Sequence, residues 1–289
     1  MIPAFAPPRQ EPSLYPVLFD RDARFHELDA CGEVSRPTIL KWFEQARRHV
    51  ERRAYGTVGP ISRPPLASVR LELLAPVRSG RSYRVGAGVS TVASSSFACT
   101  YGLFADGECV ALGESVSAHD GTDGTPSLPG VVRERLTSIG GTRLPRRDVA
   151  HDPARLVRDA YPFAIDVRSR LGDLDVARVV GNVALAGWYL DVLAELQLQV
   201  LGRPVGSAID RLAPHSLAVD HLTEVGYPGT YRLGVGVVDL DDSAVRYAFG
   251  LFDGTHCRGL ADAIGVHTVP AGPGGGELSG RLDGYRLRR

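Results

Sequence analysis

The sequence has few of the features that identify nucleic-acid-binding, membrane and secreted proteins. Its 289 residues include one methionine, four cysteines and, among the 33 basic residues, a single lysine, Lys41. The 33 acidic residues balance the basic ones, which argues against an extended surface for nucleic acid. No run approaches the roughly 20 apolar residues of a membrane helix, and residues 1–16 lack the basic start and apolar core of a signal peptide. We therefore expect a cytoplasmic protein without nucleic-acid or membrane partners.

The cysteines and histidines form no recognisable metal or redox pattern. Cys31, Cys99, Cys109 and Cys257 include no C-x-x-C pair, and the histidines are scattered without ligand spacing. There is no glycine-rich phosphate loop between a strand and a helix, and no G-x-S-x-G nucleophile elbow. The sequence therefore predicts neither a metal nor a cofactor.

What the sequence does contain is an internal repeat. Residues 27–43 read ELDACGEVSRPTILKWF, and residues 173–189 read DLDVARVVGNVALAGWY. The chain has two tryptophans, Trp42 and Trp188, and they occupy the same place in the two segments, 146 residues apart (188 − 42). A repeat of this length indicates duplicated domains rather than a solenoid.

Two further matches follow in the same order. SYRVGAGV at residues 82–89 corresponds to TYRLGVGV at 230–237, an offset of 148 (230 − 82). GLFADGEC at 102–109 corresponds to GLFDGTHC at 250–257 at the same offset (250 − 102). Three matches in one order indicate a tandem duplication.

Each half predicts one helix among several strands. Apolar residues recur at helical spacing from Ile39 to Val50, with Pro37 placed for a first turn and Gly56 for a C-terminal stop. The second helix is expected at about residues 183–201. The runs expected to be extended are 18–25, 67–74, 83–92, 96–104 and 109–118, then 161–168, 216–222, 231–238, 244–252 and 258–267. One helix against an antiparallel sheet is an α+β architecture.

These elements define the expected domain organisation. The N-terminal half spans residues 15–118 and the C-terminal half 161–268. Residues 119–160 are expected to be a linker, with a short helix near 152–159. The glycine-rich and then basic residues 269–289 are expected to be a disordered tail.

The element order resembles the hotdog fold. Residues 27–34, Glu-Leu-Asp-Ala-Cys-Gly-Glu-Val, resemble the Asp-x-x-Gly-(His)-Val motif of 4-hydroxybenzoyl-CoA thioesterases. Residues 173–183, followed by Gly-Trp at 187–188, resemble the Asp-Leu-Asp-Val-Asn-x-His-Val-Asn-Asn-Val motif of acyl-ACP thioesterases, which are double hotdogs of about this length. The resemblance extends over about residues 15–267. It implies a tandem (double) hotdog, each half a long central helix wrapped by an antiparallel sheet.

The resemblance also implies a function. It predicts an acyl-thioesterase that hydrolyses an acyl-CoA or acyl-carrier-protein thioester in fatty-acid or polyketide-type metabolism. The expected partner is the acyl thioester on coenzyme A or on acyl carrier protein, and a homodimer of double hotdogs is one expected assembly.

The resemblance assigns candidate roles to residues of both motifs. Asp29 matches the aspartate that attacks the thioester or activates water, and Asp175 is its counterpart. Free backbone N–H groups near Gly32 and Val34 are expected to bind the thioester oxygen as it becomes an oxyanion, and Glu44 is a candidate base. Further candidates for substrate contact are His26, Glu27, Trp42, Asn182 and Trp188. The structural alternatives are an Asp29 that closes a turn and a Glu44 that is solvated or ion-paired.

Departures from the family motifs keep two other functions open. Ala177 and Val179 stand where the acyl-ACP thioesterases have asparagine and histidine, and Glu33 stands where histidine is usual in the first half. Gly32 and Pro37 fit the Gly-x-x-x-x-Pro spacing of hotdog dehydratases, whose preceding histidine is Leu28 here. The alternatives are a non-hydrolytic tailoring enzyme of the dehydratase or cyclase type, and a non-catalytic protein that binds acyl or aromatic ligands.

Overall fold

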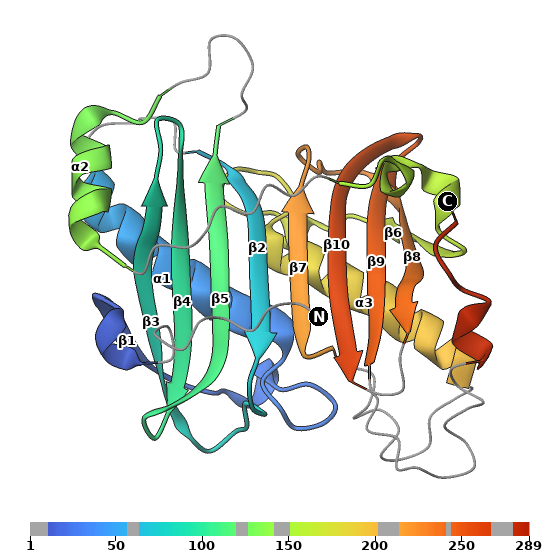
Figure 1. The fold of residues 1–289 in the computed structure, drawn as a ribbon, viewed down its shortest axis with the longest axis horizontal. Helices are drawn as coiled ribbons and strands as arrows, with labels where there is room; N and C mark the ends of the chain where they lie inside the picture. Colours follow the sequence, from blue (N-terminus) through green and yellow to red (C-terminus); the bar gives the residue numbers. More distant parts are fainter. Residues whose placement is uncertain are drawn as a thin grey trace. The chain divides into compact units, whose positions relative to one another are not determined.

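A computed structural model describes residues 11–56, 64–119, 127–141, 151–201, 214–240, 244–266 and 280–288. The chain divides into two compact units, residues 1–147 and 148–289. Each unit contains an antiparallel run of five strands and a long helix that lies across one face of it (Figure 1). No helix in the described part of the chain combines the length and hydrophobicity needed to cross a lipid bilayer.

The first unit orders its strands β1-β3-β4-β5-β2, with all neighbouring pairs antiparallel. Its long helix α1 packs on β1, β3 and β4, and the short helix α2 packs on α1 and β3. The bounds are β1 Val17–Asp22, α1 Arg36–Tyr55, β2 Leu66–Leu73, β3 Ser82–Val92, β4 Ser96–Ala105, β5 Glu108–Ala118 and α2 Gly130–Ile139.

The second unit repeats this order as β6-β8-β9-β10-β7, again antiparallel. Its long helix α3 packs on β6 and β8. The bounds are β6 Phe163–Arg168, α3 Asn182–Leu201, β7 Ser216–His221, β8 Thr230–Leu240, β9 Ala244–Asp253 and β10 His256–Val266. The strands predicted after each helix are present to within two residues, apart from the predicted end at His267, which lies outside the described residues.

Local chemistry sets the ends of α1. Ser35 precedes the helix, and its side-chain oxygen accepts a hydrogen bond from the Thr38 N–H at 3.3 Å, as an N-cap does. Pro37 occupies the first turn, where its missing N–H costs nothing. Gly56 ends the helix with a φ of 52°, a value that glycine adopts readily.

The repeated glycines are explained by a tyrosine that precedes the first strand of each unit. A methyl group on Gly86 of β3 would come within 2.7 Å of Tyr15, and one on Gly234 of β8 within 2.6 Å of Tyr161. Neither position accepts a larger residue without displacing the ring. The equivalent glycines of the two matching segments therefore pack against equivalent tyrosines in both units.

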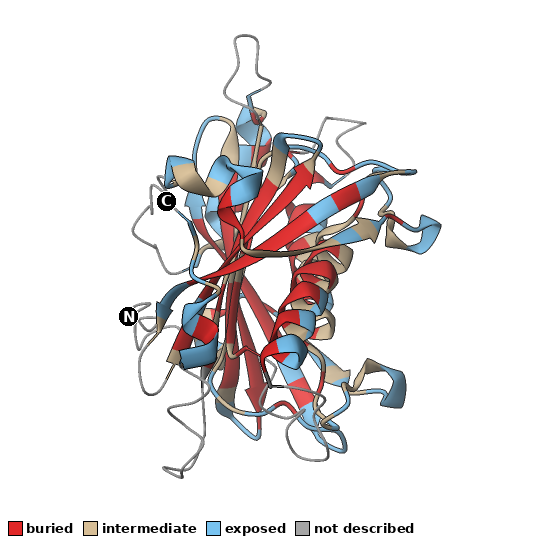
Figure 2. Ribbon diagram, turned by 90° about the vertical axis from the view of Figure 1, so that its right-hand side faces the viewer, coloured by how far each residue is buried: buried red, intermediate tan, exposed pale blue. Residues whose placement is uncertain are grey.

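The two tryptophans of the repeat lie in the two cores. Trp42 is 3% exposed and packs on Tyr83, with ring centroids 5.9 Å apart. Trp188 is 7% exposed and packs on Tyr231 at 6.1 Å. Buried residues line the facing surfaces of each long helix and its sheet (Figure 2), so each unit has its own apolar core.

The linker and the tail differ from the composition-based expectation. Residues 130–139, placed in the linker, form α2, in which Leu136 is fully buried. Residues 280–288, placed in a disordered tail, pack on the second unit: the N–H of Val237 donates to the carbonyl of Tyr285 at 2.8 Å. The expectation of disorder is therefore wrong for these nine residues, whereas residues 269–279 and 289 lie outside the described residues.

Candidate active site

The two acidic motifs form loops of the same design. In each, a single 3-10 turn (Phe25–Glu27 or Leu171–Asp173) leads into a tight backbone loop. The N–H of Asp29 donates to the carbonyl of Glu33 at 2.7 Å, and the N–H of Asp175 to that of Val179 at 2.9 Å. The duplication therefore extends to individual hydrogen bonds before each long helix.

Both aspartates also hold their own loops with one carboxylate oxygen. Oδ1 of Asp29 accepts hydrogen bonds from the N–H groups of Cys31 (2.9 Å) and Glu33 (3.1 Å). Oδ1 of Asp175 accepts one from the N–H of Ala177 at 2.7 Å. One oxygen of each carboxylate thus has the turn-closing role that aspartate commonly takes, so any chemistry depends on the other oxygen.

The backbone N–H groups expected to bind an oxyanion are already used. The N–H of Gly32 donates to the Asp29 carbonyl at 3.0 Å, and the N–H of Val34 donates to the Val77 carbonyl at 2.6 Å. The expectation that these two groups are free is therefore wrong, because the loop and the neighbouring segment take their hydrogen bonds.

The second carboxylate oxygen distinguishes the two aspartates. Oδ2 of Asp29 is 3.1 Å from Nη1 of Arg36, a buried arginine at the start of α1 that also lies 3.6 Å from Glu33. The counterpart of Arg36 is Asn182, which carries no charge. Within the described residues Asp175 makes no ion pair, and its Oδ2 has no hydrogen-bond partner there.

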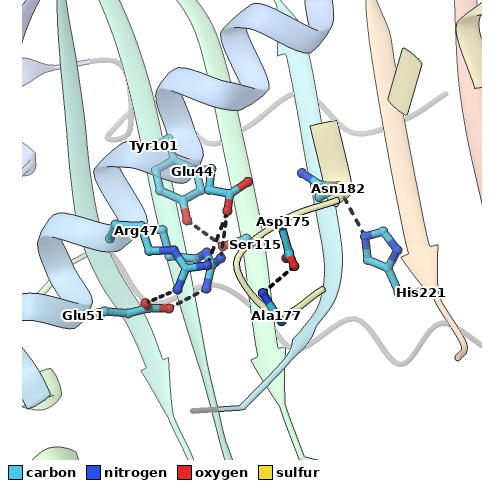
Figure 3. Close-up of polar contacts among 10 residues, drawn as sticks. Glu44, Arg47, Glu51, Tyr101, Ser115, Asp175, Ala177, Asn182 and His221 are labelled. Carbon is cyan, nitrogen blue, oxygen red and sulfur yellow. Dashed lines mark hydrogen bonds and ion pairs between the residues drawn. The ribbon is translucent and has the colours of Figure 1, made fainter. Parts of the chain in front are cut away.

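Asn182 instead pairs with a histidine that the sequence analysis did not single out. Nε2 of His221 lies 3.3 Å from Oδ1 of Asn182 (Figure 3). Burial lowers the pKa of His221 from 6.5 to about 4, so its imidazole is neutral at physiological pH. The available signal was the alternation of β7, in which His221 follows the buried Leu217 and Val219 on the helix-facing side.

Glu44 belongs to a charged cluster on one flank of α1. Its Oε1 lies 3.5 Å from both Arg47 and Arg48, and Arg48 lies 3.0 Å from Glu51. Arg47 pairs directly with Glu51, whose side chain is 1% exposed, while Tyr101 and Ser115 share a hydrogen bond of 2.5 Å close by (Figure 3). Glu44 is thus ion-paired, the structural alternative considered for it from sequence.

The other predicted contact residues lie in different environments. His26 is exposed, and Glu27 holds its own loop because its Oε2 accepts the Arg24 N–H at 2.9 Å. Val34, like the two tryptophans, is buried in a core. Asn182, which follows the Asp175 loop, contacts a polar side chain of its sheet, His221.

Comparison with known proteins supports the fold. No protein-family model matches the sequence, and no curated protein matches it. The structure is similar to an oleoyl thioesterase (putative) from Lactobacillus plantarum, with a TM-score of 0.69 and 14% identity over 89% of this chain and 96% of that one. A 12:0-ACP thioesterase from Umbellularia californica gives 0.68 and 14% over 86% and 97%. An acyl-ACP thioesterase from Bacteroides thetaiotaomicron gives 0.65 and 14% over 86% and 96%. The chain therefore has the tandem hotdog fold that the resemblance implied, in two halves as the repeat predicted.

Proposed function

We propose that the protein hydrolyses an acyl thioester carried by coenzyme A or by an acyl carrier protein. The fold, shared with structures named as oleoyl and acyl-ACP thioesterases, supports this function. The observation that carries the proposal is the carboxylate of Asp175. It lies just before the long helix of its unit, is fixed through Oδ1, and keeps Oδ2 outside any ion pair among the described residues.

In the proposed reaction, Oδ2 of Asp175 accepts a proton from water as the water oxygen attacks the thioester carbonyl carbon. The carbonyl π electrons move to oxygen and return as the C–S bond breaks. The sulfur leaves as a thiolate and takes the proton that Asp175 accepted from water, so the products are a carboxylic acid and a free thiol and the carboxylate of Asp175 is regenerated. No redox partner is needed.

The first unit supplies a weaker candidate base. Oδ1 of Asp29 accepts hydrogen bonds from the loop backbone, and its Oδ2 lies 3.1 Å from Nη1 of Arg36, so both carboxylate oxygens of Asp29 already have partners. We assign Asp29 and Glu44 secondary roles in the reaction. We also place the reaction in cytoplasmic fatty-acid or polyketide-type metabolism and propose a homodimer as the assembly.

The test is thiol release from a panel of acyl-CoA and acyl-carrier-protein thioesters by wild type, Asp175→Asn and Asp29→Asn. We expect Asp175→Asn to lower kcat by at least 100-fold, within the range of about 10²–10⁴ for the loss of a general base. We expect Asp29→Asn to keep more than a tenth of the activity. The reverse order would move the site to Asp29. If wild type releases no thiol, hydrolysis is excluded for that panel and ligand binding becomes the better account.

A further inference from the structure

We propose that the side-chain amide of Asn182 donates a hydrogen bond to the thioester carbonyl oxygen and that His221 is the positioning residue that orients this amide. The inference rests on the proposed function and deepens it. It concerns only residues of the second unit, around the acidic loop that contains Asp175.

The first step is the place of Asn182. It is the first residue of α3 and follows Gly181, whose N–H donates to the carbonyl of Asp173 at 2.9 Å. A methyl group on Gly181 would lie 3.3 Å from Cβ of Asp175. The backbone next to Asn182 is therefore in contact range of the aspartate, so Asn182 and Asp175 lie at the same end of α3.

The second step is the hydrogen-bond chemistry of the pair. Oδ1 of an amide only accepts, so Nε2 of His221 must carry the hydrogen in their 3.3 Å contact. The two hydrogens on Nδ2 of Asn182 then remain available to another acceptor. If this contact is lost, the amide can turn and present Oδ1 to the substrate, which repels a carbonyl oxygen that is gaining negative charge.

The third step is the charge state of the histidine. Burial is the cause that lowers the pKa of His221, and no neighbouring charged group contributes to the shift. The imidazole is therefore neutral around pH 7 and holds one hydrogen, on Nε2. A neutral donor orients the amide without placing a buried positive charge beside the apolar core.

The fourth step is the comparison with the first unit. Strand register pairs Leu73 with Ala111 as it pairs His221 with Gly259, so Leu73 is the counterpart of His221. Arg36 is the counterpart of Asn182 and is bound to Asp29. The first unit thus has neither member of the pair, and the histidine accompanies the aspartate that lacks an ion pair.

In the reaction, Asn182 makes a hydrogen bond but transfers no proton. Its Nδ2 hydrogen stabilises the negative charge that collects on the carbonyl oxygen when water attacks, and the bond weakens again when the C–S bond breaks. Removing one such donor typically lowers kcat by about 10²–10³-fold. A positioning residue that acts through it is expected to matter less.

The kinetic test compares His221→Leu, His221→Gln, Asn182→Ala and the double variant His221→Leu/Asn182→Ala on one thioester. Leucine is the residue of the first unit, and glutamine replaces the Nε2 donor with an amide donor. We expect kcat to fall about 100-fold in Asn182→Ala and about 10-fold in His221→Leu, with KM within threefold of wild type. Glutamine should restore at least a third of the activity. The double variant should be no slower than Asn182→Ala, because His221 acts only through Asn182.

Two outcomes would overturn the positioning role. One is an additive loss of kcat in the double variant. The other is a His221→Gln variant that unfolds at the wild-type temperature but does not recover activity. His256→Leu, an exposed histidine at the start of β10, serves as the control and should leave kcat unchanged.

A binding test separates this inference from the proposed function. The probes are an acyl-CoA analogue with a ketone in place of the thioester and the matching thioether, which has no carbonyl. Wild type should bind the ketone at least tenfold more tightly, and Asn182→Ala and His221→Leu should lose this preference. Asp175→Asn, which removes the base of the proposed function, should keep this preference. Equal binding of the two probes by wild type would overturn the inference even if thiol release is observed.

Discussion

Two equivalent positions in the acidic loops have the same backbone conformation but different residues. Gly32 has a φ of +75° and Arg178, its counterpart, has a φ of +65°. Left-handed backbone costs a residue with a side chain about 1–2 kcal/mol relative to glycine, less the entropy that glycine loses on folding. The second loop therefore keeps the left-handed conformation although its residue there is Arg178, whereas the first loop has a glycine, which favours this conformation.

Arg178→Gly should stabilise the protein by about 1 kcal/mol, and Gly32→Ala should destabilise it by a similar amount. Arg178 is exposed, and a methyl on Gly32 would meet nothing within 4 Å, so strain is the dominant effect at both positions. Denaturant unfolding of the two variants measures both changes. A loss of stability in Arg178→Gly would contradict the left-handed assignment.

His221 gives the folding stability a predictable pH dependence. The pKa of His221 is about 4 in the folded protein and 6.5 when unfolded, so the unfolded chain binds the extra proton between these values. The contribution of His221 to the folding stability is therefore fully present above pH 6.5 and is lost as the pH drops towards 4. Below pH 4 this group causes no further loss. The full loss is about 3 kcal/mol at 1.36 kcal/mol per pKa unit.

The measurement is the free energy of unfolding at pH 7, 5.5 and 4 for wild type and His221→Leu. Leucine removes the titrating group, so the variant should show a shallower decline, with the difference between the two proteins confined to this pH range. Parallel declines in both proteins would assign the acid sensitivity to other groups.

At the scale of elements, α1 and α3 are equivalent helices that have different residues at the same buried positions. Arg47 and Glu51 of α1 are 7% and 1% exposed in their side chains. The repeat places Leu193 and Gln197 at the same positions of α3. Burying two charges costs desolvation that their attraction repays only in good geometry, so the ion pair is no simple gain in stability.

Arg47→Leu alone should destabilise the protein by about 3 kcal/mol, because Glu51 is left as a buried carboxylate. Arg48, 3.0 Å from Glu51, remains as a partial partner and keeps the loss at the lower end. Arg47→Leu/Glu51→Gln, which copies α3, should recover at least half of the loss. A double-mutant cycle by denaturant unfolding tests this, and additive losses would contradict the coupling of the pair.

The sequence predicts the regular elements well because their patterns are local. Period-two alternation in β3, β4, β8 and β9 and helical spacing in α1 follow directly from which side chains face a core. The helix α2 was missed because the surrounding segment is rich in glycine, aspartate and proline, which favours the assignment of a linker. Its burial depends on contact with α1, which composition does not reveal.

The candidate site was predictable only in part, for a similar reason. Asp29, Asp175 and Asn182 stand out because the motifs repeat along the chain. The Arg36 ion pair and the His221 contact depend on which side chains meet in space, and His221 lies 39 residues from Asn182. A histidine at an inward position of a strand is the one sequence signal that pointed to it.

At the scale of the whole molecule, the repeat is longer than the sequence matches indicate. Nη1 of Arg135 in α2 donates to the carbonyl of Ala54 at 3.2 Å, and Nη1 of Arg281 donates to that of Val200 at 3.0 Å. The two arginines are 146 residues apart (281 − 135), and so are the two residues whose carbonyls accept the hydrogen bonds (200 − 54). The supposed linker helix and the supposed tail are thus the same closing element of the duplicated unit.

This equivalence predicts that each closing element stabilises its own unit. Leu136 and Leu282 follow the two arginines and are 0% and 1% exposed. Truncation of a buried leucine to alanine costs about 3 kcal/mol, equivalent to about a 100-fold increase in local opening. Leu136→Ala should therefore accelerate amide hydrogen exchange in β3, where the Val89 N–H donates to Gly140 at 2.8 Å.

Leu282→Ala should do the same in β8, where the Val237 N–H donates to Tyr285 at 2.8 Å, and should leave β3 near its wild-type rate. Hydrogen exchange followed by mass spectrometry of peptides from the two strands measures both effects in one experiment. If Leu282→Ala left exchange in β8 unchanged, the C-terminal segment would not be part of the folded unit. If either variant accelerated hydrogen exchange equally in β3 and β8, the two halves would unfold together as one cooperative unit. The prediction that each closing element stabilises its own unit would then be wrong.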